Sequence, residues 1–340
     1  IYEENITVNS FEVQKRLELT EEYSWKVVAK DSSGAMVSSA ERSFRTRGLH
    51  FNDTPETASA KFKQRFEHAS VVFQDKMWVL GGAVSFQDNV SDVWASSDGV
   101  TWSLATNEAF EDRSGHSAEV FQDRILVIGG INDNGAKNAD VWSSEDGVIW
   151  KPLVKEAEFS KRTGHSSVVF EGAIWIMGGF DENNEFLNDV WRSEDGITWK
   201  EATPKAKFSP RAGHSSVVIE DAIYLIGGQE EGLVRKNDVW VSKDGVNWEI
   251  LNDNASFTGR RDHGTIVFDN KLWVIGGLDA TDRKNDAWFS TDGRTWVEAT
   301  ESAPFSRRYS HTSLVYNNKA WIIAGLDEFN IDQNDVWSFE

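Results

Sequence analysis

The chain has 340 residues, 39% of them hydrophobic and 12% aromatic, which is enough to bury a large core. Its formal net charge of −20, with 55 acidic against 35 basic residues, opposes binding to nucleic-acid phosphates and to anionic membrane surfaces. The chain has no cysteine, which excludes disulfides and thiolate metal sites, and no apolar run approaches the ~18 residues of a membrane span, so we expect a soluble protein without membrane insertion.

Residues 1–46 do not share the pattern of the rest of the chain. Alternating apolar and polar side chains predict two half-buried strands near residues 23–30 and 42–47, joined by a turn. The Tyr-Ser-Trp run at 23–25 and the Phe-Arg-Thr run at 44–46 resemble the second half of a fibronectin type III domain. The first strands of such a domain are missing and the chain opens on isoleucine, so we expect a fragment of a longer protein.

From about residue 47 to the end, one motif recurs. Its histidines stand 48, 49, 49, 49 and 48 residues apart, at His68, His116, His165, His214, His263 and His311. A near-constant period of this length indicates a repeat architecture. We therefore expect two domains, residues 1–46 and 47–340.

The third repeat illustrates the predicted secondary structure of one period. Residues 165–170 and 174–177 are short runs rich in Val and Ile separated by Glu171-Gly172, which is typical of a hairpin. A third strand is expected at 188–192, and a two-residue Asp-Gly turn leads to a fourth strand with Trp199. Four antiparallel strands per period, without helical periodicity, predict one blade of a β-propeller.

The repeat resembles that of the kelch family, which has paired glycines after the second strand and a tryptophan in each of the last two strands. Five glycine pairs recur, and the sixth repeat departs with Ala324-Gly325; the pairs begin at Gly81, Gly129, Gly178, Gly227 and Gly276. The tryptophans are Trp94, Trp142, Trp191, Trp240, Trp288 and Trp337 in the third strands, and Trp102, Trp150, Trp199, Trp248 and Trp296 in the fourth. The resemblance implies an all-β, six-bladed propeller.

The last repeat lacks a fourth strand, because the chain ends at Glu340 directly after the third. An open blade would leave a sheet edge unpaired. Residues 48–53 are the expected replacement, pairing beside Val336 and Trp337, with Phe51 in the place of the missing tryptophan. The two ends of the domain would then close the ring.

The groups that recur in every repeat are interpreted as scaffold. The histidine of each Gly-His and the Asp of each Asp-x-Trp resemble partners in the buried hydrogen-bond network of WD-repeat blades, which we favour over a ring of metal ligands. The arginine that precedes each histidine is expected to pair with backbone or a carboxylate: Arg65, Arg113, Arg162, Arg211, Arg260 and Arg308. The Ser-x-Asp-Gly-x-x-Trp turns resemble the Asp-box of sialidases, in which the box is a turn far from the active site.

Residues that differ between repeats are the better candidates for a site. Between the repeated Arg and His, repeats two to four carry small residues, whereas repeats five, six and one carry Phe66, Glu67, Arg261, Asp262 and Tyr309. These three repeats are neighbours in a closed ring, so their side chains are expected at one side of the channel mouth. The loops after the glycine pairs lie on the same face and add aromatic and charged side chains, among them Phe180, Arg235, Arg283 and Phe329.

The expected function is a non-catalytic binding module that presents this face to a protein or glycan ligand. Copper radical oxidases resemble kelch propellers but require a cysteine, which excludes that activity here. Sialic acid mutarotases of the kelch type are six-bladed, and Glu67 near Arg261 keeps a carbohydrate-active enzyme as the alternative. We expect no cofactor, no nucleic-acid partner and a monomer. The fibronectin-like segment favours an extracellular or cell-surface location.

Overall fold

The computed structural model describes residues 22–30, 33–45, 51–86 and 88–340. The chain divides into two compact units, Ile1–His50 and Phe51–Glu340. No helix in the described part has the length and apolarity to cross a membrane. The described structure is nearly all β, with one short 3-10 helix, η1 (Glu231–Leu233).

The described part of the first unit is a narrow pair of two-stranded sheets. β1 (Glu22–Trp25) pairs with β4 (Arg42–Arg45), and β2 (Val28–Lys30) pairs with β3 (Met36–Ser38), both antiparallel. The rings of Tyr23 and Phe44 stack at 5.9 Å between centroids. Most of the apolar side chains remain exposed, so the unit has little core of its own. The likeness to a fibronectin type III domain stays a prediction.

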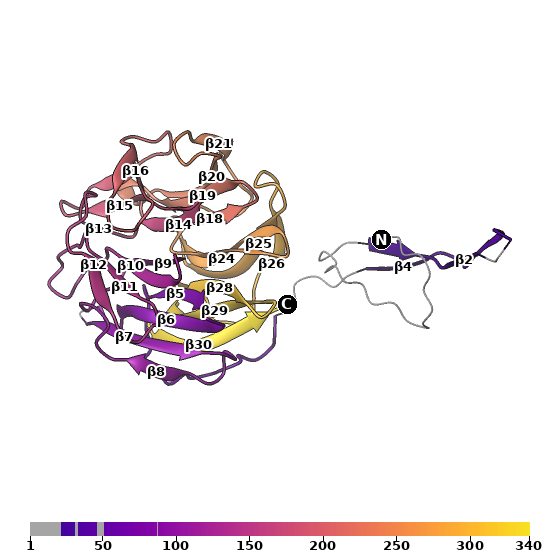
Figure 1. Ribbon diagram of the computed structural model, residues 1–340, viewed down its shortest axis with the longest axis horizontal. Helices are drawn as coiled ribbons and strands as arrows, with labels where there is room; N and C mark the ends of the chain where they lie inside the picture. Colours follow the sequence, from indigo (N-terminus) through magenta and orange to yellow (C-terminus); the bar gives the residue numbers. More distant parts are fainter. Residues whose placement is uncertain (1–21, 31–32, 46–50, 87) are drawn as a thin grey trace. The chain divides into compact units, whose positions relative to one another are not determined.

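The described strands of the second unit form five antiparallel sheets, the largest of which joins the strands of the last two repeats through β27 (Arg308–Tyr309). We number the strand groups of the six repeats as blades one to six in chain order (Figure 1). Their strands are β5 (Ala69–Phe73), β6 (Lys76–Ala83), β7 (Asn89–Ser96) and β8 (Ser103–Thr106); β9 (Ser117–Phe121), β10 (Arg124–Ile128), β11 (Val141–Ser144) and β12 (Lys151–Val154); β14 (Ser166–Phe170), β15 (Ala173–Asp181), β16 (Phe186–Ser193) and β17 (Lys200–Thr203); β18 (Ser215–Ile219), β19 (Ala222–Gln229), β20 (Arg235–Ser242) and β21 (Glu249–Asn252); β23 (Gly264–Phe268), β24 (Lys271–Asp279), β25 (Arg283–Ser290) and β26 (Val297–Thr300); and β28 (Thr312–Tyr316), β29 (Lys319–Asp327) and β30 (Asp332–Phe339).

The first strands of the blades form a closed ring around the central channel. They contact one another in the order β5, β9, β14, β18, β23 and β28, and β28 returns to β5. Short two-residue strands before three of the histidines pair with the ends of the second strands; these are β13 (Arg162–Thr163), β22 (Arg260–Arg261) and β27 (Arg308–Tyr309). The loop into each first strand and the loop after each second strand therefore lie together at one end of the channel, which we call the mouth.

Blade six is completed from the start of the propeller, which confirms the predicted closure but shifts its register. Phe51 bridges to Phe339, and Thr57 bridges to Val336 with backbone hydrogen bonds of 3.2 and 2.8 Å. Phe51 packs on Phe305 as Trp199 packs on Phe159 in blade three. The pairing expected for residues 48–53 beside Val336 is wrong, because the partner of Val336 is Thr57, which lies further along the chain from Phe51 than Thr203, the partner of the equivalent Val190, lies from Trp199. Residues 48–50 lie outside the described residues.

This closure can be tested at Phe51, which is 9% exposed and contacts two aromatic rings. Phe51→Ala is expected to reduce the free energy of unfolding by about 3–5 kcal/mol, because it removes a buried aromatic ring from the seam between the two chain ends. Phe51→Trp, which inserts the residue of the other blades, should cost much less. Urea denaturation of the three proteins is the measurement. Equal midpoints for wild type and Phe51→Ala would contradict the closure.

Every blade contains a buried Arg–Asp–Trp group. In blade three, the Arg162 guanidinium donates to both carboxylate oxygens of Asp189 at 2.9 and 2.7 Å and to the carbonyl of Gly178 at 3.0 Å. The Trp191 indole N–H donates to the same carboxylate at 2.8 Å. All six arginines are buried, and the fork of guanidinium donors fits this two-oxygen partner. The group ties the start of each repeat to its third strand.

The histidines do not share a network with these aspartates, so the expected WD-like arrangement is wrong. The Arg and Trp donors already occupy the carboxylate, and the imidazole Nε2 atoms lie instead against neighbouring blades. His165 Nε2 is 3.0 Å from the Ser117 hydroxyl, and His116 Nε2 is 3.1 Å from the Leu80 carbonyl. Burial and the nearby arginine lower the pKa of all six histidines, to about 3 for His116, His214 and His311.

Candidate functional site

The residue immediately before each histidine belongs to a continuous ring of main-chain hydrogen bonds at the mouth. Each N–H donates to the carbonyl of the equivalent residue in the preceding blade, at 2.7 to 3.0 Å, and the circuit closes from blade one to blade six. We call these residues the mouth ring; they are Glu67, Gly115, Gly164, Gly213, Asp262 and Ser310. All six have a positive φ, between 51 and 65°.

Half of the mouth ring uses residues that this conformation disfavours. Glycine occupies it in blades two, three and four, where a left-handed backbone costs little. Glu67, Asp262 and Ser310 adopt the same conformation at a cost of about 1–2 kcal/mol each. They stand in three consecutive blades, so the strain is confined to one side of the mouth. Such strain is typical of functional positions.

Glu67 is half-buried in this strained half. The hydroxyl of Ser114 donates to its carboxyl group at 3.1 Å. Burial, reinforced by the negative charge of Asp262, raises the pKa of Glu67 to about 7. At neutral pH the side chain is therefore present in both protonation states, so it can donate or accept a proton.

Two guanidinium groups lie against the ring of Tyr309. The Cζ atom of Arg261 is 5.4 Å from the ring centroid and that of Arg283 is 5.5 Å, both within cation–π distance. Arg261 also forms an ion pair with the adjacent Asp262. Tyr309 is only partly exposed, and burial raises the pKa of its hydroxyl. The predicted residues Glu67, Arg261, Asp262 and Tyr309 are thus brought together as one cluster.

Arg235 and Arg283 extend this cluster; the sequence placed them on the loops of this face but did not assign them to the cluster. Each begins the third strand of its blade, β20 or β25, on the loop face of the mouth. Burial and the charge of Arg261 lower the pKa of Arg235, so these two guanidinium groups are close enough to repel each other. Within the described residues, neither Arg235 nor Arg283 has a carboxylate within ion-pair distance. The buried Nε atoms of all three arginines also lack a hydrogen-bond partner there.

The three predicted phenylalanines occupy different places. Phe66 is buried in a cluster with Ala83 and Leu326. Tyr309 packs against this cluster, so Phe66 helps to hold Tyr309 in place and is not itself exposed to a ligand. Phe329 is 72% exposed on the loop after β29. Phe180 packs on Phe186 at 4.3 Å in blade three, in the half of the mouth built of glycines. It therefore lies apart from the cluster.

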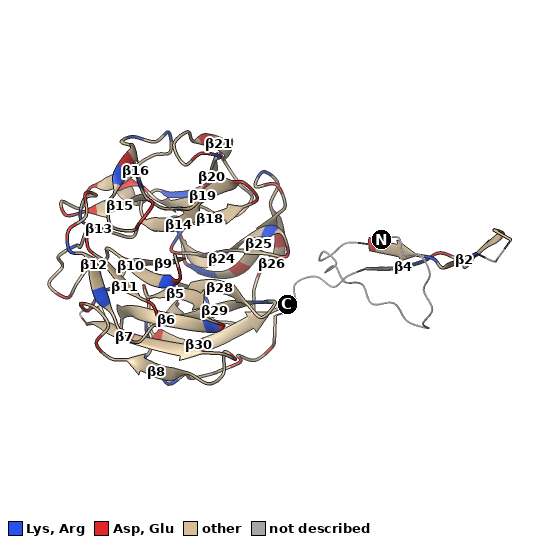
Figure 2. Cartoon of the chain, in the orientation of Figure 1, with Lys and Arg blue, Asp and Glu red and all other residues tan. Residues whose placement is uncertain are grey.

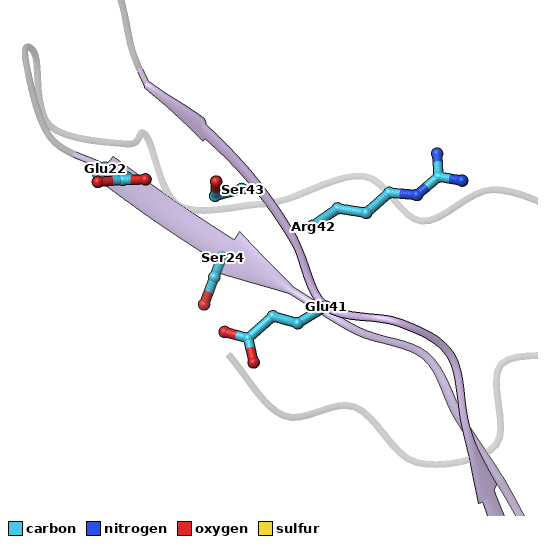
Figure 3. A pocket seen from close by; sticks show the side chains of 5 residues that line it. All are labelled: Glu22, Ser24, Glu41, Arg42 and Ser43. Atoms are coloured by element: carbon cyan, nitrogen blue, oxygen red, sulfur yellow. The ribbon is translucent and has the colours of Figure 1, made fainter.

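Other polar features do not compete with this cluster. Acidic and basic residues are otherwise scattered around the propeller (Figure 2). No three His, Asp or Glu side chains of the described residues are placed to hold a metal ion. The hollow of about 470 Å³ on the first unit is lined by Glu22, Ser24, Glu41, Arg42 and Ser43, whose side chains extend in different directions (Figure 3). Those residues are all exposed, and they lie in or next to β1 and β4.

A sequence profile of the KLHDC2/KLHL20/DRC7 Kelch-repeats domain matches residues 43–228 and again residues 195–340. The chain belongs to the kelch-repeat family. Among solved structures, this kelch propeller is similar to one described as "Structure of YjhT", with a TM-score of 0.70 and 16% sequence identity over 83% of this chain and 96% of that chain. At that identity the likeness shows the fold alone. A search of curated proteins finds no match for this kelch chain.

Proposed function

We propose that the propeller is a binding module whose mouth takes a carboxylate-bearing protein or glycan ligand. The observation that carries the proposal is the group of Arg235, Arg261 and Arg283 around Tyr309, in which two of the three cations have no carboxylate partner among the described residues. Clustered cations repel one another, and a bound anion would relieve that repulsion while filling the unused guanidinium donors. The chain has a net charge of −20, yet among the residues that the structure describes no carboxylate lies within ion-pair distance of Arg235 or Arg283, although Asp262 and Asp279 are near enough to attract Arg235.

The proposal predicts that Arg283→Ala and Arg235→Ala each weaken binding of a carboxylate ligand by about tenfold to a hundredfold, the range expected for losing one charged hydrogen bond. The probes are an array of sialylated and uronic-acid glycans and a displayed library of random peptides. Arg294→Ala serves as the control, because Arg294 is exposed on a turn between the third and fourth strands, away from the mouth. A ligand that binds wild type and both mouth variants equally would exclude this site.

A carbohydrate-active enzyme resembling the sialic acid mutarotases is the second candidate. The pKa of Glu67, near 7, favours it. Interconversion of sugar anomers requires one group to take the proton of the anomeric hydroxyl and another to protonate the ring oxygen, and Glu67 could serve in either role. The test is anomer exchange of a sialic acid followed by NMR. Exchange abolished in Glu67→Gln with binding retained would support the enzyme, whereas binding without exchange in wild type would favour the module.

The setting of the protein remains part of the proposal. We propose an extracellular or cell-surface location, by analogy with proteins that combine fibronectin-like segments and propellers. A monomer is likewise proposed. Size-exclusion chromatography with light scattering would measure the oligomeric state directly.

A further inference from the structure

The wall of the mouth beside the arginine cluster changes from cationic to aromatic over three neighbouring blades. In each of these blades, a residue at the end of the second strand lies directly opposite the first residue of the third strand, so the two side chains share one face of the sheet. The pairs are Leu278 with Arg283 in blade five, Gln229 with Arg235 in blade four, and Phe180 with Phe186 in blade three. The cationic surface therefore ends at a pair of aromatic rings.

This phenylalanine pair adjoins the half of the mouth that is built of glycines. The rings of Phe180 and Phe186 lie 4.3 Å apart between centroids, so they pack together. A Cβ atom on Gly164 would lie 3.8 Å from Cδ2 of Phe180 and 3.5 Å from the Cβ atom of Ala212. Phe180 is partly exposed. Because Gly164 has no side chain, nothing from that position covers the Phe180 ring.

Gln229 adds an unused hydrogen-bond acceptor beside Arg235. Its main chain pairs with that of Ala212 through hydrogen bonds of 3.0 and 2.8 Å, which places it next to Gly213 of the mouth ring. The Gln229 side chain is only 9% exposed, and its Oε1 atom has no hydrogen-bond partner among the described residues. A buried acceptor without a donor lowers stability, so each such atom in a native protein requires an explanation. A donor supplied by a ligand explains this one.

We propose that Phe180 and Gln229 form a second subsite, which takes a neutral sugar ring linked to the acidic sugar that the arginines hold. The inference rests on the proposed function and narrows its ligand to an acidic glycan of at least two rings. A sugar ring carries an apolar C–H face and hydroxyl groups on one rigid unit. The C–H face would lie on the Phe180 ring while a hydroxyl donates to Oε1 of Gln229. An aliphatic side chain of a peptide would leave that acceptor unsatisfied.

The experiment uses matched pairs of probes: the methyl glycosides of sialic acid and of glucuronic acid, and the same two acids linked to galactose. In NMR titrations of wild type, the added galactose is expected to tighten binding at least tenfold for at least one acid, through the stacking contact and the new hydrogen bond. Phe180→Ala and Gln229→Leu should each reduce that gain below threefold. Arg283→Ala should weaken binding of both members of the pair, because it removes a partner of the acid.

Two controls separate loss of the subsite from loss of the fold. Phe86→Ala removes another aromatic side chain of the mouth face, one that is 70% exposed on the loop of blade one, and should leave the gain from galactose unchanged. Gln229→Leu nearly conserves side-chain volume and removes an acceptor that has no partner. Its midpoint of urea denaturation is therefore expected to match or exceed that of wild type.

The outcomes distinguish this inference from the function on which it rests. If galactose gives wild type no gain, or if the gain persists in Phe180→Ala or in Gln229→Leu, the second subsite is wrong. The carboxylate site still stands in that case, provided that Arg283→Ala weakens binding of the acid alone. Binding of acidic peptides but of no acidic glycan, lost in Arg283→Ala, also overturns only this inference. If neither acidic glycans nor acidic peptides bind, both the proposed function and the inference fall.

Discussion

Acidification is expected to unfold the propeller cooperatively at about pH 5. The six repeated histidines are buried with pKa values well below the ordinary 6.5, so they stay neutral in the native state and gain protons only on unfolding. A group whose native pKa is lowered in this way costs native stability as the pH falls below its unfolded value. Each histidine therefore lowers the free energy of unfolding by about 1.4 kcal/mol for every pH unit below about 6.5.

The sum is large because the group recurs in every blade. At pH 5.5 the six histidines together lower the free energy of unfolding by about 8 kcal/mol, which is comparable with the whole stability of many domains. Glu67 and Glu119 act in the opposite direction. Burial raises the pKa of each to about 7, so the native state binds their protons more tightly than the unfolded state does. Each of these two groups therefore raises the free energy of unfolding by at most about 2 kcal/mol at pH 5.5. The histidines prevail, and unfolding should take up about four protons near this pH.

Urea denaturation at a series of pH values between 5 and 7 measures this effect, because the slope of stability against pH gives the number of protons taken up. His116→Gln is expected to reduce that number by about one, even if it also lowers stability at neutral pH. Glu119→Gln should steepen the slope, since it removes an opposing group. Stability that does not change between pH 5 and 6.5 would show that the histidines are not held neutral.

Removing the carboxylate of one Arg–Asp–Trp group is expected to cost about 3–5 kcal/mol of unfolding free energy. Asp286 of blade five pairs with Arg260 at 2.7 and 2.8 Å, and the Arg260 side chain is completely buried. Asp286→Ala would therefore leave an unpaired charge in the interior and a Trp288 indole N–H without its acceptor. Breaking such a pair costs far more than the net contribution of the pair itself, because the remaining partner cannot return to water.

Two control variants identify the cause of the stability loss expected for Asp286→Ala. Glu194→Ala removes an exposed partner of Arg192 at 2.8 Å and should change stability by less than about 1 kcal/mol. The double variant Arg260→Met with Asp286→Leu should recover much of the loss, because two apolar side chains leave no charge behind. Guanidinium denaturation midpoints are the readout. A loss in the double variant as large as in Asp286→Ala would mean that packing, and not the orphaned charge, accounts for the effect.

The fold was accessible from sequence because the repeat places the same residues in the same register in every blade. The paired glycines, the tryptophans and the Gly-His step each recur at the predicted strand ends, and the register of Phe51 identified the closing segment. The point where pairing resumes at Thr57 was missed, since the closing segment has two more residues between Phe51 and Thr57 than blade three has between Trp199 and Thr203.

The site was only partly accessible. Comparing repeats at the step before each histidine found Glu67, Arg261, Asp262 and Tyr309, but the burial of Phe66 depends on packing between blades. Arg235 and Arg283 were assigned only to the loops of this face, because they lie in other strands and only the ring brings them to Tyr309. A comparison of the blades at the first position of the third strand would have found them; the equivalent residues are Asn89, Lys137, Phe186, Arg235, Arg283 and Asp332.

The mouth ring helps to close the propeller through contacts that do not depend on the side chains available to bind a ligand. Its six hydrogen bonds use main-chain atoms alone, so any residue that accepts the left-handed backbone can occupy a position without breaking the circuit. Gly164 has the most room, because a Cβ atom there would meet nothing nearer than 3.5 Å. Asparagine tolerates this backbone well, so Gly164→Asn would place an amide in the half of the mouth built of glycines. Ligand preference could thus be redesigned one blade at a time on an unchanged scaffold.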